Sequence, residues 1–194
     1  MDTADQLWDA FRTGDMEAFG NLYHRYYRPL YNYGFTIFAD KEVVMDCLHE
    51  MFLDLWERRE RLPSVKQVKY YLLVAFRRRI IQVAQASRLS NDDIPEVKQA
   101  SVEDQFVIRE SQLLFDSRFK EAFNKLPHRR REAIYLRYGQ ELSYDQIVNV
   151  MGIEYQTARD LVSKGIKSLR KELQSKDVAG SAAPLSTGIL NWST

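Results

Sequence analysis

The stretch that most constrains the fold lies between Ser143 and Arg170, where apolar residues recur at helical spacing. Ser143 is followed three residues later by Gln146, a capping-box spacing that predicts the start of a short helix ending at Gly152. A longer helix follows, with an apolar stripe made of Ala158, Leu161, Val162, Gly165, Ile166 and Leu169. Two helices joined by a short glycine-containing turn are typical of a helix-turn-helix.

The opposite face of the longer helix carries the groups that DNA recognition requires. Arginine pairs with guanine, glutamine with adenine, and serine or lysine with phosphate. We expect this face to enter a major groove through Tyr155, Gln156, Arg159, Asp160, Ser163, Lys164 and Lys167. A helix that only closes a small core would also have a polar face. Charge favours recognition, because residues 119–176 hold 12 Lys and Arg against 7 Asp and Glu, a net charge of +5 in a chain of +1.

Helical periodicity continues through most of the remaining chain, and strand-like alternation is absent. Asp15 is the expected N-cap of a helix that Pro29 should kink or split, and Asp40 that of a helix reaching about Arg59. Further helices are predicted over residues 63–87, over residues 101–125 and after Pro127. The chain is therefore predicted to be all-α.

Two small helical domains joined by a flexible linker are the economical interpretation. The first domain covers residues 1–88, and a polar segment containing Pro95 forms the linker over residues 89–102. The second domain covers residues 103–175, and the small-residue stretch 176–194 is predicted to be a disordered tail.

Composition limits the classes of protein. Cys47 is the single cysteine, so an intramolecular disulfide and a cysteine-based zinc site are excluded. No apolar run reaches the roughly 18 residues of a membrane span, and the acidic N-terminus is not a secretory signal, so we expect a cytoplasmic protein. His24, His49 and His128 are scattered and no glycine-rich phosphate loop is present, so we expect no enzyme activity and no cofactor or metal.

The first domain has two unusual surfaces. Four carboxylates fall at i, i+4, i+8 and i+11 along one predicted helix and form an acidic ridge of Asp46, Glu50, Asp54 and Glu57. Such a ridge suits a basic protein partner, although a merely solvated helix face has the same spacing.

The next helix combines cations with aromatic rings, which suits single-stranded nucleic acid because bases stack on rings while the backbone follows positive charge. The residues expected there are Lys66, Lys69, Tyr70, Arg77, Arg78 and Arg79. The alternative is that the rings are core, which we expect for Tyr71, Leu72 and Phe76.

Taken together, these stretches resemble the extracytoplasmic-function (ECF) branch of bacterial sigma factors over roughly residues 10–175. The stretch DCLHEMFLDLW is similar to the polymerase-docking helix of sigma region 2, usually Asp-x-x-Gln-Glu-x-Phe-x-x-x-Trp. Asp46, Glu50, Phe52 and Trp56 match, and His49 stands where Gln is usual. YYLLVAFRRRII resembles the promoter-melting helix, and residues 126–170 resemble sigma region 4.

The resemblance implies a role for each surface. The acidic ridge would face a basic coiled coil of core RNA polymerase. Residues 62–67, with Lys69, Tyr70 and Arg77–Arg79, would capture and open the −10 element, and the helix-turn-helix would read the −35 element. Arg129–Arg131 and Arg137 would hold phosphate or polymerase. An anti-sigma factor is a further partner that the family implies, and no small-molecule substrate is expected.

Two other classes of protein remain as alternatives. A stand-alone helix-turn-helix regulator would bind operator DNA without polymerase, and a helical adaptor would bind proteins only. The acidic ridge and the three arginines are poorly explained by the first alternative, and the basic recognition face by the second.

Overall fold

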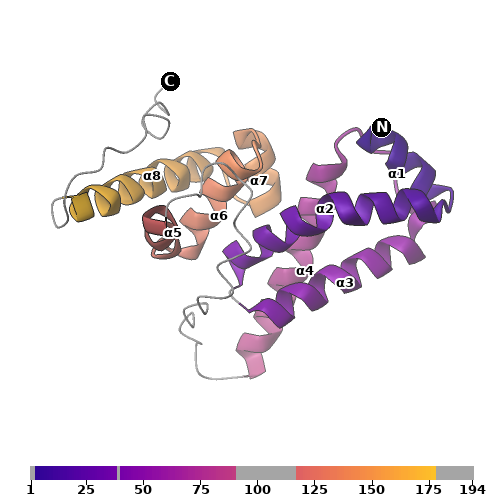
Figure 1. Ribbon diagram of the computed structural model, residues 1–194, viewed down its shortest axis with the longest axis horizontal. Coiled ribbons are helices and arrows are strands. Elements are labelled where there is room, and N and C mark those ends of the chain that lie inside the picture. The colour runs from indigo at the N-terminus through magenta and orange to yellow at the C-terminus, as the bar shows by residue number, and fades with distance from the viewer. Residues whose placement is uncertain (1–2, 39, 91–116, 178–194) are drawn as a thin grey trace.

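The computed structural model describes residues 3–38, 40–90 and 117–177, and within these ranges the secondary structure is helical with no strand. The helices are α1 (Ala4–Arg12), α2 (Met16–Ile37), α3 (Lys41–Glu57), α4 (Val68–Ser90), α5 (Ser117–Asn124), α6 (His128–Ile134), α7 (Tyr144–Met151) and α8 (Tyr155–Asp177). Figure 1 shows α1 to α4 gathered on one side and α5 to α8 on the other. The predicted all-α class is confirmed.

Two helices of the first group, α2 and α3, begin at the N-caps that the sequence predicts. The Asp15 carboxylate accepts hydrogen bonds from the backbone N–H groups of Glu17 and Ala18, at 2.8 and 3.0 Å. Asp40 accepts the N–H of Val43 at 3.2 Å. α2 is continuous through Pro29, so the predicted split is wrong. Buried residues on both sides of the proline hold the helix against one core: Leu22, Tyr26, Leu30 and Tyr33.

Aromatic rings fill the end of this core nearest α1. Phe19 on α2 stacks on Phe11 of α1 with ring centroids 5.5 Å apart, and it lies 5.1 Å from Trp56 of α3. At the other end a glycine permits close packing. A Cβ on Gly34 would lie 2.6 Å from Val44 and 3.1 Å from Phe76, so α2, α3 and α4 meet where no side chain fits.

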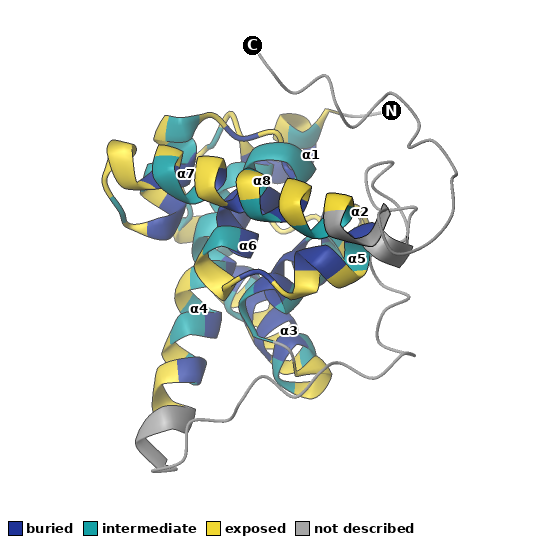
Figure 2. Ribbon diagram, turned by 90° about the vertical axis from the view of Figure 1, so that its left-hand side faces the viewer, coloured by how far each residue is buried: buried dark blue, intermediate teal, exposed yellow. Residues whose placement is uncertain are grey.

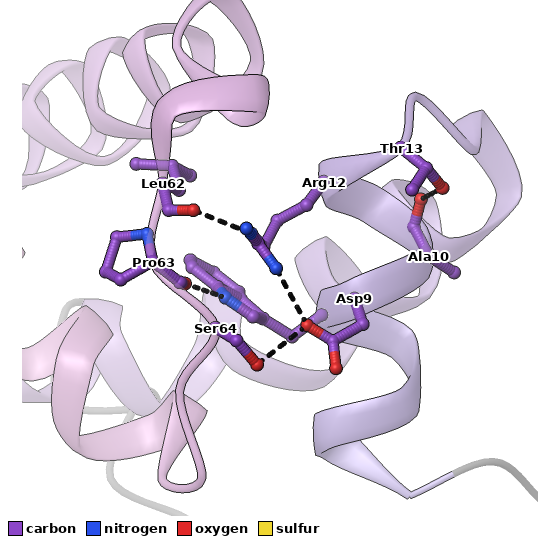
Figure 3. Close-up of polar contacts among 8 residues, drawn as sticks. Asp9, Ala10, Arg12, Thr13, Leu62, Pro63 and Ser64 are labelled. Carbon is purple, nitrogen blue, oxygen red and sulfur yellow. Dashed lines mark hydrogen bonds and ion pairs between the residues drawn. The ribbon is translucent and has the colours of Figure 1, made fainter.

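The helix predicted from residue 63 begins only at Val68, which corrects the sequence interpretation. Residues 62–64, which precede α4, form hydrogen bonds with side chains of α1, as Figure 3 shows. The Trp8 indole N–H donates to the carbonyl of Pro63 at 2.9 Å, and Arg12 Nε donates to that of Leu62 at 2.7 Å. The Ser64 hydroxyl donates to Asp9 at 3.0 Å. Ser64 therefore anchors a loop instead of capping a helix.

In the second helical group the helix-turn-helix is confirmed. Ser143 and Gln146 form the predicted capping box of α7, and Gly152 ends α7 with a left-handed φ of 62°. The apolar stripe of α8 faces inward, and Figure 2 shows buried and exposed residues alternating along this helix. A Cβ on Gly165 would lie 2.5 Å from Ile134 Cδ1, so α8 and α6 are in close contact.

The other predictions for the second helical group are only partly confirmed. α6 follows Pro127 as expected and then passes into a π-helical turn, Tyr135–Gly139, which the sequence did not indicate. Of the helix predicted over residues 101–125, residues 117–125 are described, and Ser117–Asn124 of these are helical. The predicted linker and tail lie outside them, apart from residues 89–90, which are helical in α4, and residues 176–177, which are helical in α8.

The two helical groups pack directly on each other, which the sequence did not predict. α6 contacts α2, and α7 contacts α4. None of the helices in the described ranges is long and apolar enough to cross a membrane.

Candidate functional site

The recognition face of α8 points away from the core, as predicted. Gln156, Arg159, Ser163, Lys164 and Lys167 are exposed. Asp160, which we expected to contact DNA, is half-buried and lies between two of these donors: Gln156 Nε2 is 3.2 Å from Oδ1, and Lys164 Nζ is 3.4 Å from Oδ2. Its carboxylate therefore orients neighbouring donors, because a carboxylate facing DNA alone would repel phosphate.

The start of this helix is braced by aromatic packing. The exposed ring of Tyr155 meets Tyr144 of α7 edge-on at 5.8 Å. The Arg137 guanidinium lies 5.1 Å above the Tyr144 ring and donates to the carbonyl of Leu142 at 2.9 Å. Arg137 therefore supports the turn before α7. This geometry does not favour the expectation that Arg137 mainly holds phosphate or polymerase.

The acidic ridge lies along α3. Asp46, Glu50 and Glu57 are exposed, while Asp54 is half-buried and pairs with Arg58. Leu53 stands among these carboxylates with 61% of its surface exposed. Leu53 was not predicted as a site residue, although its position outside the buried stripe of the helix is a sequence signal for an exposed apolar side chain.

A groove of about 490 Å³ lies beside the loop that α1 holds. Its lining combines two cations, two tyrosines and two amides, and consists of Val65, Lys66, Gln67, Tyr70, Tyr71, Val74, Arg78 and Asn149. Three of the residues predicted for single-stranded DNA, Lys66, Tyr70 and Arg78, are thus brought together. Trp8 lies behind this groove, because its ring meets Tyr71 edge-on at 5.1 Å while its N–H holds the loop.

The other three predicted cations are engaged elsewhere. Arg79 pairs with Glu50 of the acidic ridge. Lys69 donates from Nζ to the carbonyl of Gln140 at 2.9 Å, and burial lowers the pKa of its ammonium. Arg77 donates from Nε to Glu132 at 2.6 Å. Burial lowers the pKa of this guanidinium, but the hydrogen bond and the charge of Glu132 outweigh burial and raise it.

Arg131 corrects another expectation. The residue is buried, and its guanidinium donates to two carbonyls, that of Thr36 at 3.3 Å and that of Asn124 at 3.1 Å. Arg131 is therefore a packing residue that joins the two helical groups and is not available to phosphate in this arrangement. Arg129 is exposed.

Comparison with known families explains why these surfaces occur in one chain. Residues 22–88 match the family model "Sigma-70 region 2", and residues 122–171 match "Sigma-70, region 4". The two models together cover more than half of the chain, in the order that the sequence predicted. The chain belongs to the sigma-70 family. Its function is that of a sigma factor in transcription initiation, and membership in the ECF branch stays a prediction.

Solved structures agree with this sigma-factor fold. The sigma factor RpoE, in its complex with the anti-sigma factor NepR from Bartonella quintana, is 20% identical with a TM-score of 0.64, over 82% of this chain and 98% of that chain. CnrH, in complex with the cytosolic domain of CnrY, is 17% identical with a TM-score of 0.62, over 90% of this chain and 99% of that chain. No curated protein sequence matches this sigma factor significantly.

Proposed function

We propose that this sigma factor directs core RNA polymerase to promoters through three separate surfaces. The acidic ridge of α3 docks on polymerase, the groove beside α4 captures the melted −10 strand, and the outer face of α8 reads the −35 element. What carries the proposal is the presence in one chain of an exposed helix-turn-helix face and a cationic, aromatic groove.

The acidic ridge suits a basic coiled coil because it combines charge with an apolar centre. Charged residues steer and align a partner, whereas an apolar side chain that becomes desolvated contributes more of the affinity. Leu53 supplies that apolar centre between Glu50 and Asp54. Arg79, paired with Glu50, fixes the direction of the Glu50 carboxylate.

The groove suits a single strand because its lining offers each chemical group that such a strand needs. Tyr70 and Tyr71 supply rings for base stacking, while Lys66 and Arg78 supply cations for the backbone. Tyr71 is half-buried and lines the groove, which corrects the expectation that it belongs to the core. The capture of flipped bases offsets the few kcal/mol that unstacking of each step costs. α1 contributes by holding residues 62–64, so that the region 2 side of the groove is in place before DNA arrives.

The remaining partners and the compartment follow from this role. The chain works with polymerase in the cytoplasm and contributes recognition and strand capture instead of a catalytic activity of its own. An anti-sigma factor is a partner by analogy with RpoE, whose solved structure contains the anti-sigma factor NepR.

A promoter selection tests the proposed function. Core polymerase with the full chain is incubated with a randomised DNA library, and the transcribed templates are sequenced. Enrichment of two separated elements, one lost with Arg159→Ala and the other with Tyr70→Ala, is the expected result. Enrichment of a single element that the chain binds equally well without polymerase would instead favour the stand-alone regulator.

A further inference from the structure

Region 4 covers part of the surface that we assign to the melted strand. Lys69 Nζ donates to the carbonyl of Gln140 at 2.9 Å, and Gln146 Nε2 donates to Gln67 Oε1 at 2.6 Å. Asn149 of α7 forms part of the groove wall. The strand-capture surface consists of the groove lining from region 2 together with Lys69 and Arg77. Region 4 therefore occupies polar groups of this surface that DNA would otherwise contact.

The centre of this contact is a buried polar cluster, the interdomain triad of Tyr33, Arg77 and Glu132. The Glu132 carboxylate is 2% exposed and accepts the Tyr33 O–H at 2.8 Å and the Arg77 Nε–H at 2.6 Å. Tyr33 is fully buried. A buried carboxylate is costly unless paired, and both partners that satisfy Glu132 in this contact, Tyr33 and Arg77, come from region 2.

Neighbouring contacts fix the same arrangement. The Tyr135 ring stacks on Tyr33 with centroids 6.1 Å apart and an interplanar angle of 14°. The Tyr135 hydroxyl donates to the carbonyl of Pro29 at 3.4 Å, and Arg131 donates to that of Thr36 at 3.3 Å. Ring packing and hydrogen bonds thus define one closed arrangement of α6 against α2 (Figure 1).

Promoter geometry conflicts with this closed arrangement. Elements centred near −10 and −35 are about 25 base pairs apart, which is about 85 Å of duplex. A compact chain of 194 residues is only about 40 Å across. One chain cannot hold both elements while region 4 rests on region 2, so promoter binding requires the two regions to separate.

We propose that region 4 is an internal competitor of promoter DNA for the strand-capture surface, with the interdomain triad holding the closed state. The proposal rests on the proposed function of that surface. Carboxylate and phosphate bind a guanidinium through the same charge-assisted hydrogen bonds, so Glu132 takes the place of a backbone phosphate at Arg77. A single strand that pairs with Arg77 and Lys69 removes the partners of Glu132 and Gln140, and the closed state opens.

The first test loosens the triad in the full chain. Glu132→Gln removes the charge that holds Arg77 but keeps the size of the side chain. The matched control is Glu172→Gln, which removes an ion pair with Lys125 inside region 4, 3.5 Å in length. The readouts are the radius of gyration from small-angle X-ray scattering and the affinity for a fluorescein-labelled, random-sequence single-stranded decamer.

We expect Glu132→Gln to increase the radius of gyration and to raise the decamer affinity by about fivefold or more, within the usual range of coupling between sites. Glu172→Gln is expected to change neither value. An unchanged radius and affinity in a folded Glu132→Gln chain overturn the proposal.

The second test closes the interface instead of opening it. Gln67→Cys with Gln146→Cys, in a Cys47→Ala background, is bridged by a short bis-thiosulfonate reagent that reduction removes. Because the same protein is compared before and after reduction, its folding does not affect the result. We expect the bridged chain to bind the decamer at least about fivefold more weakly than the reduced chain.

The outcomes separate the two proposals. Equal binding before and after reduction overturns competition by region 4 while leaving strand capture intact. Absence of decamer binding in the reduced chain and in Glu132→Gln alike refutes strand capture by this surface, and the competition claim with it.

Discussion

Arg77 on α4 and Glu132 on α6 are 55 positions apart, and the guanidinium Nε lies 2.6 Å from the carboxylate. This pair joins a residue assigned to promoter melting with a residue of the helix that precedes the helix-turn-helix. Under the two proposals, this cation pairs with Glu132 in the closed chain and with a strand phosphate on DNA.

Base recognition by α8 predicts a position-specific loss. Arg159→Ala in the full chain, assembled with core polymerase, is expected to weaken promoter binding by about 1–3 kcal/mol at one base pair of the −35 element, because a guanidinium reads one guanine. Lys171→Ala, further along the same helix, serves as the control. Affinities for a set of singly substituted promoters give the answer, and an equal loss on every promoter would contradict base recognition.

The apolar centre of the acidic ridge predicts a loss of polymerase affinity. Leu53→Ala is expected to weaken core binding by about tenfold, roughly 1.4 kcal/mol, because the exposed side chain becomes desolvated on docking. The free energy of unfolding should change by less than about 0.5 kcal/mol, as for other surface substitutions. Met16→Ala is the matched control, since Met16 is 63% exposed and Leu53 is 61% exposed. Equal affinities for both variants would remove Leu53 from the docking surface.

The contact between α1 and the groove loop predicts a defect in opening. Trp8→Phe retains a ring beside Tyr71 but loses the hydrogen bond to Pro63, at a cost of about 1 kcal/mol in stability. With the loop less fixed, permanganate reactivity of melted thymines should fall, while affinities for core polymerase and for the −35 element stay unchanged. Arg25→Ala, on α2 and outside this contact, is the control. Parallel losses in all three readouts would indicate a general fold defect and no positioning role.

Close packing at Gly34 predicts opposite effects for two glycines of one helix. Gly34→Ala forces a methyl group against Val44 and Phe76 and is expected to destabilise the chain by about 1–3 kcal/mol. Gly20→Ala has open space around its Cβ and is expected to stabilise α2 by about 0.5–1 kcal/mol. Urea unfolding of both variants measures the difference. A neutral Gly34→Ala would show that the three helices are less tightly packed than described.

Local signals predicted much of this fold. Asp15, Asp40 and Ser143 cap helices through hydrogen bonds to residues two or three positions away, so a single sequence contains all the information needed. The stripe of α8 was equally visible, because burial follows helical periodicity. Membership in the sigma-70 family needed only the order of two such patterns.

Non-local contacts account for what the sequence did not predict. Ser64 has the spacing of an N-cap, but its hydroxyl donates a hydrogen bond to Asp9, 55 positions away. The sequence around Arg131 suggests a phosphate ligand, but its guanidinium donates to the carbonyl of Thr36, 95 positions away. The groove and the interdomain triad likewise depend on which helices pack together. The spacing of residues along a single helix does not indicate its packing partners.

Affinity for bacterial core RNA polymerase, measured by competition against a resident sigma factor, tests the central claim most directly. The account predicts nanomolar, competitive binding that Asp46→Arg with Glu50→Arg abolishes while helix content is retained. Failure of the folded chain to compete, or competition that survives the charge reversal, would contradict docking through the acidic ridge of α3.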